Sequence, residues 1–76
     1  MTKEEAKRIL KDFLNKKKVV RGELVEAFIV AGLEAEYYEM CRQDGIPDTI
    51  DEELVDIFNE LSDRLDRAIP QINKEN

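Results

Sequence analysis

The chain has no histidine, and its 76 residues include one cysteine, two prolines and three glycines. Without histidine, it can form neither a Cys-His nor a Ser-His-Asp catalytic arrangement, nor a histidine-ligated metal site. The lone Cys41 cannot form an internal disulfide, and no charged-then-apolar leader opens the sequence, so we expect a cytoplasmic protein. No apolar run approaches the roughly 20 residues of a membrane-spanning helix. We therefore expect no membrane insertion.

Charge is distributed unevenly along the chain. Residues 1–21 hold eight basic and three acidic side chains, a net +5, whereas residues 22–76 hold four basic and 15 acidic ones, a net −11. The candidates for phosphate contact are the basic residues Lys16, Lys17, Lys18 and Arg21. The alternative is that these lysines complement the negative end of a helix dipole. Because the acidic remainder would be repelled by phosphate, we do not expect direct DNA binding.

Helical periodicity covers most of the sequence. The predicted helices span residues 3–17, 23–43 and 50–69, and residues 70–76 are predicted to be a frayed tail. The first helix begins with a capping box formed by Thr2 and Glu5, and apolar residues then recur at helical spacing from Ala6 onward. The second is expected to end before Gly45 and Pro47.

The third predicted helix has a clear start and end. Thr49 and Glu52 form a second capping-box pattern, and Pro70 stops the helix. Acidic residues fill its first turn, where the helix dipole favours negative charge. The predicted i,i+4 ion pairs of this helix are Glu60 with Arg64 and Asp63 with Arg67.

Apolar residues line two sides of the predicted second helix. One side consists of Leu24, Phe28, Ala31, Ala35 and Tyr38. The other side, a predicted interface, consists of Val25, Ile29, Leu33, Tyr37 and Met40. A domain of this size buries only about 60% of its unfolded surface and commonly gains stability by oligomerising. We therefore predict a single all-α domain over residues 1–76, a three-helix antiparallel bundle or helical hairpin with a basic N-terminal helix, which forms a homo-oligomer.

Acidic residues recur at a spacing suited to metal binding. The two pairs are Glu23-x-x-Glu26 and Glu53-x-x-Asp56. Carboxylates three residues apart share one face of a helix, and two such pairs brought together would offer the oxygen ligands that Mg²⁺ or Mn²⁺ prefers. In a chain with 18 acidic residues, such pairs also arise by chance. A longer acidic face on the third helix consists of Glu53, Asp56, Glu60 and Asp63.

Three segments share the order and spacing of a known motif set. They are Gly22-Glu23-Leu24-Val25-Glu26-Ala27, Asp44-Gly45-Ile46-Pro47 and Glu52-Glu53-Leu54-Val55-Asp56-Ile57. Over about residues 22–69 the chain partially resembles the MazG-like all-α nucleotide pyrophosphohydrolases. The resemblance implies that Mg²⁺ ions clamp a nucleoside triphosphate for hydrolysis, with Glu23, Glu26, Glu53 and Asp56 as the metal ligands. Arg21-Gly22 stands where that family has two adjacent glutamates, so the motif is incomplete.

These patterns are consistent with three functions. The favoured one is a non-catalytic interaction protein, regulatory or inhibitory, which uses no cofactor and binds through the apolar face of the second helix and the acidic face of the third. The alternative is a divergent Mg²⁺- or Mn²⁺-dependent nucleoside triphosphate pyrophosphohydrolase. The third is a phage-type inhibitor whose acidic face mimics the phosphates of a nucleic acid.

Overall fold

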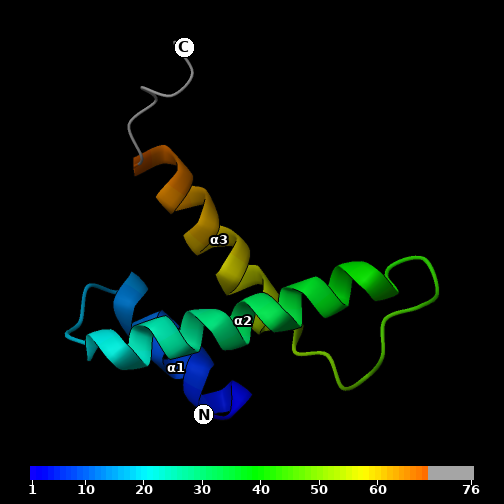
Figure 1. Cartoon of the computed structure of the whole chain (residues 1–76), viewed down its shortest axis with the longest axis horizontal. Coiled ribbons are helices and arrows are strands. Elements are labelled where there is room, and N and C mark those ends of the chain that lie inside the picture. The colour runs from blue at the N-terminus through cyan, green and yellow to red at the C-terminus, as the bar shows by residue number, and fades with distance from the viewer. Residues whose placement is uncertain (69–76) are drawn as a thin grey trace.

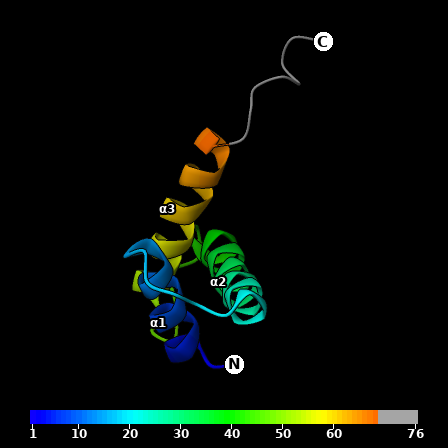
Figure 2. The ribbon, with the colours of Figure 1, turned by 90° about the vertical axis from the view of Figure 1, so that its left-hand side faces the viewer.

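The computed structural model describes residues 1–68, which form three α-helices and no strand. The helices are α1 (Lys3–Leu14), α2 (Arg21–Cys41) and α3 (Glu52–Ala68). Each helix packs against the other two. α1 crosses the N-terminal half of α2, and α3 begins beside the middle of α2 and extends away from it (Figures 1 and 2). The predicted all-α fold of three packed helices is confirmed, and the predictions for residues 69–76 lie outside the described residues.

The first helix starts as predicted but ends earlier. The Glu5 amide donates to Thr2 Oγ1 (3.1 Å), and the Thr2 amide donates to Glu5 Oε1 (3.1 Å), which completes the capping box. α1 ends at Leu14 rather than residue 17, because Lys16 adopts a left-handed conformation with φ 64°. The amide of Lys16 donates to the Phe13 carbonyl (3.0 Å), and the next amide donates to the Asp12 carbonyl (2.9 Å). These two bonds close the helix end as a Schellman motif.

The boundaries of α2 differ from the predicted ones by two residues at each end. The helix begins at Arg21, after Val20 in an extended conformation, and ends at Cys41. Gly22 therefore lies inside the first turn instead of preceding the helix. Gly45 adopts a φ of 107°, a conformation that residues with a Cβ atom rarely tolerate, in the turn that leads toward α3.

The cap of α3 is provided by Asp51, and the prediction of a Thr49 capping box is wrong. Asp51 Oδ1 accepts a hydrogen bond from the Leu54 amide (3.2 Å), and its carbonyl accepts one from the Val55 amide (3.2 Å). The carbonyl of Thr49 instead accepts from Lys3 Nζ of α1 (3.1 Å). α3 thus begins at Glu52, two residues after the predicted start.

The core lies between one side of α2 and the apolar stripes of α1 and α3. Its buried residues are Ala6, Ile9, Leu10, Ala27, Ala31, Leu54, Ile57 and Leu61, with a second cluster of Ala35, Ile50 and Val55. At Gly32 a Cβ atom would lie 3.1 Å from Phe58 Cε1, so the glycine permits the close approach of α3. The Phe58 ring also packs against Phe28, with ring centroids 4.8 Å apart. Within residues 1–68, no helix is long and apolar enough to span a membrane.

Candidate interaction surface

One side of α2 exposes large apolar side chains along nearly the whole helix. We call this surface the apolar row, and it consists of Val25, Ile29, Leu33, Tyr37 and Met40. The five residues are between 47% and 72% exposed. Their spacing of three or four residues places them on a single side of the helix. The structure therefore brings together the five residues of the predicted interface.

A groove with apolar walls opens at the N-terminal half of the apolar row. Its volume is about 640 Å³, and it lies between the end of α1, the first half of α2 and the second half of α3. Its apolar lining consists of Phe13, Leu14, Leu24, Val25, Phe28, Ile29, Leu61 and Leu65. The three charged residues that line it, Lys16, Lys17 and Arg64, are all basic. We call them the basic rim.

Two of the predicted phosphate contacts belong to this rim. Lys16 and Lys17 lie in the turn after α1, beside the apolar lining, whereas Lys18 and Arg21 are exposed outside the groove. Within residues 1–68, neither Lys16 nor Lys17 takes part in an ion pair. The contact of these basic residues with phosphate stays a prediction.

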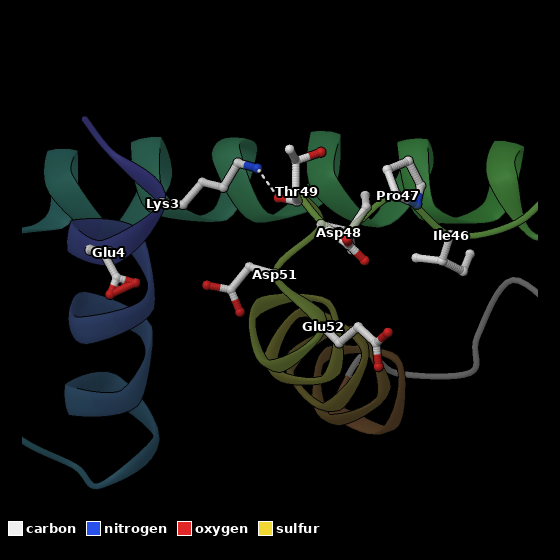
Figure 3. A pocket seen from close by; sticks show the side chains of 9 residues that line it. Lys3, Glu4, Ile46, Pro47, Asp48, Thr49, Asp51 and Glu52 are labelled. Carbon is white, nitrogen blue, oxygen red and sulfur yellow. Dashed lines mark hydrogen bonds between the residues drawn. The ribbon is translucent and has the colours of Figure 1, made fainter.

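A network of ion pairs joins the three helices on another side of the molecule. Glu34 of α2 is only 7% exposed, and its Oε2 accepts from Lys3 Nζ (2.8 Å) and from the Asp51 amide (2.8 Å). Figure 3 shows Lys3 reaching from α1 toward the segment before α3, where it also donates to the carbonyl of Thr49. A hollow of about 620 Å³ opens here. The buried carboxylate is thus satisfied by two donors, as buried charges require.

Lys7 forms the second half of this network. Its Nζ lies 2.7 Å from Asp51 Oδ2, 3.3 Å from Glu4 Oε1 and 3.4 Å from Glu53 Oε1. The hydrogen bond with Asp51 is the main cause that raises the pKa of Lys7, and the same bond lowers the pKa of Asp51. The pKa of Glu53 is lowered by its bonds with Lys11 and Lys7. These contacts anchor the start of α3 on α1.

The predicted metal ligands are distributed over these different surroundings. Glu53 is paired with Lys7 and Lys11, and Glu26 lies 3.3 Å from the amino group of Met1. Glu23 and Asp56 are exposed. Among residues 1–68, no three acidic or cysteine side chains are placed to hold a metal ion together. The ligand set stays a prediction.

The acidic face of α3 is largely engaged with basic residues of the same chain. Glu60 Oε2 lies 2.9 Å from Arg64 Nη2, and Asp63 Oδ2 lies 3.5 Å from Arg67 Nη2, so both predicted i,i+4 pairs are confirmed. Glu53 contacts two lysines of α1. Three of the four carboxylates on this face therefore have a positive neighbour already.

Sequence reasoning did not identify Glu34 or its partners. One signal was present, because Glu34 follows Ala27 and Ala31 at the spacing that faces the core. A charged residue at a core-facing position predicts a buried ion pair. A second signal is the four-residue spacing of Lys3, Lys7 and Lys11, which gives α1 a basic side beside the acidic start of α3.

Comparisons with known proteins do not assign the chain to a family. No protein-family model matches the chain, and neither a curated protein nor a solved structure matches it.

Proposed function

We propose that this chain is a small helical interaction protein, rather than an enzyme, and that it binds a second copy of itself through the apolar row of α2. The observation that carries the proposal is the exposure of five large apolar side chains along one side of the longest helix. Soluble monomers rarely expose a contiguous apolar surface of this kind unless it binds a partner.

The composition of α2 supports this proposal. Its buried apolar residues are the small Ala27, Ala31 and Ala35, and its larger residues Leu24, Phe28 and Val30 pack against the core only partly buried. Ile29, Leu33 and Met40, in contrast, are exposed. The large buried side chains of the core come from α1 and α3. The three-helix fold therefore leaves five large apolar side chains of α2 accessible, and a second helix covers them most simply.

The acidic face of α3 contributes less to the proposal. Three of its carboxylates are held by lysines or arginines of the same chain. A surface that mimics phosphates needs carboxylates free to meet a basic partner. The favoured contact is therefore the apolar row, with self-association as its outcome.

The test is the mass of the protein in solution as a function of concentration. Wild-type protein is expected to show a concentration-dependent dimer in sedimentation equilibrium. Leu33→Glu, at the centre of the row, should give a monomer with unchanged helix content. Val20→Glu is the matched control, because Val20 is 62% exposed and Leu33 is 61% exposed, but Val20 lies outside the row. A monomeric wild type, or equal effects of the two substitutions, contradicts the proposal.

A further inference from the structure

The groove at the end of α1 has a chemical character that defines what fits it. Its walls are apolar, and its charged lining residues Lys16, Lys17 and Arg64 are all basic, in a chain whose net charge is −6. A complementary surface must therefore combine apolar side chains with carboxylates. Charge complementarity of this kind selects partners and fixes their register.

The C-terminal half of α2 has this complementary character. Leu33, Tyr37 and Met40 are exposed there, and Glu36 and Glu39 stand between them in the sequence on the exposed surface. We call these five residues the acidic half of α2. It lies outside the groove, whereas Val25 and Ile29 at the other end of the row line it. One end of the apolar row thus lines a groove with a basic rim, and the other end is flanked by exposed carboxylates.

We propose that the groove of each copy receives the acidic half of α2 from a second copy, with the two α2 helices antiparallel. This inference rests on the proposed self-association through the apolar row. A two-fold axis near Leu33 would place Tyr37 opposite Ile29 of the other copy, and Met40 close to its Val25. Because a two-fold contact is self-complementary, the same contact fills both grooves.

Electrostatics favour the antiparallel arrangement over a parallel one. Parallel helices would place Glu36 and Glu39 beside their own copies and would align the two helix dipoles. In the antiparallel arrangement, these glutamates approach the basic rim of the other copy. Opposed charges then meet at both ends of the contact.

The charged side chains are available for such pairing. In the part of the chain that the structure describes, Lys16, Lys17 and Glu36 take part in no ion pair. Glu39 is paired with Arg42 (3.2 Å), and Arg64 with Glu60 (2.9 Å). These two pairs are at least half exposed, and exposed pairs contribute little, so exchanging them costs little. Glu36 with Lys16 and Lys17 is the principal predicted contact.

A charge-swap experiment tests the arrangement. One variant carries Lys16→Glu and Lys17→Glu, and the other carries Glu36→Lys and Glu39→Lys. Each alone places like charges at both grooves, so its dimer should be about 10- to 100-fold weaker than wild type. An equimolar mixture should form a heterodimer of near wild-type affinity, because both of its grooves then regain opposite charges. Native mass spectrometry and sedimentation equilibrium measure the species, and circular dichroism confirms that each variant is folded.

The possible results separate this inference from the function on which it rests. If Leu33→Glu abolishes the dimer but the charge reversals leave it unchanged, or their mixture gives no heterodimer, self-association stands and the groove arrangement is overturned. If wild-type protein stays monomeric, both proposals are overturned, and the groove takes a different occupant, such as an acidic amphipathic peptide or a long-chain carboxylate. The antiparallel contact is supported only if the mixture forms a heterodimer of near wild-type affinity.

Discussion

We expect Lys16→Gly to stabilise the protein, because the backbone of Lys16 is held in a conformation that favours glycine. Its φ of 64° closes α1, and the closing bonds use backbone atoms that glycine retains. A left-handed conformation costs a residue with a Cβ atom roughly 1–2 kcal/mol. The greater freedom of glycine in the unfolded chain offsets about 0.5–1 kcal/mol of this gain. The expected net gain is about 0.5–1 kcal/mol, a rise in Tm of roughly 2–8 °C for a chain of this size.

The assay is thermal and urea unfolding followed by circular dichroism, in the Leu33→Glu background so that self-association does not contribute. Lys17→Gly is the matched control, because Lys17 is also exposed and also belongs to the basic rim, but its φ is not positive. Its replacement removes the same charge and should lower the free energy of unfolding by up to about 1 kcal/mol. If the two variants lose stability equally, the reasoning about the end of α1 is refuted.

Three further predictions concern the packing of the helices, the ion-pair network and metal binding. Gly22→Ala should raise the free energy of unfolding by up to about 1 kcal/mol, because a Cβ atom there meets nothing within 4 Å. Gly32→Ala must displace the Phe58 ring, so this variant should be less stable than Gly22→Ala in urea unfolding. Equal gains in the free energy of unfolding would contradict the close approach of α3. Asp51→Asn keeps the helix cap but loses the ion pair with Lys7. Since folding lowers the pKa of Asp51, its contribution is present above the unfolded value near 3.8 and is lost as the pH falls through the folded value. The variant should therefore be less stable than wild type at pH 7, and the difference in urea midpoint should shrink below about pH 4; a difference that does not change with pH would contradict this. Finally, millimolar Mn²⁺ should leave Tm unchanged, whereas a rise that Glu53→Gln abolishes would support the metal hypothesis.

The number of helices and the two sides of α2 could be predicted from the sequence, because both depend on local apolar periodicity. The start of α1 at its capping box could also be predicted, but the other helix ends could not. Thr49 and Asp51 are both good N-cap residues, and contacts with α1 decide between them, since Lys3 binds the carbonyl of Thr49 and Lys7 binds the side chain of Asp51. Likewise, the turn at Lys16 shows no glycine to signal a left-handed residue.

The candidate surface was predictable in part for the same reason. The apolar row lies on one helix, so the spacing of Val25, Ile29 and Leu33 was sufficient to identify it. The groove is assembled from the end of α1, the start of α2 and the end of α3. Its existence depends on how the three helices cross, which periodicity does not specify. The partly buried contact of Lys3 with Glu34 spans 31 residues and depends on the same crossing.

The distribution of residue sizes on α2 connects the fold with the proposed contact. Alanines and Gly32 on the core-facing side let α1 and α3 approach closely, but small side chains bury little apolar area. The large side chains of Leu33 and Met40 in α2 are nevertheless exposed, in a row that lines a groove with a basic rim at one end and is flanked by carboxylates at the other. A second copy whose α2 runs antiparallel would cover the exposed apolar side chains and would also bring opposite charges together. The charge-swap mixture is therefore the most demanding test of this arrangement.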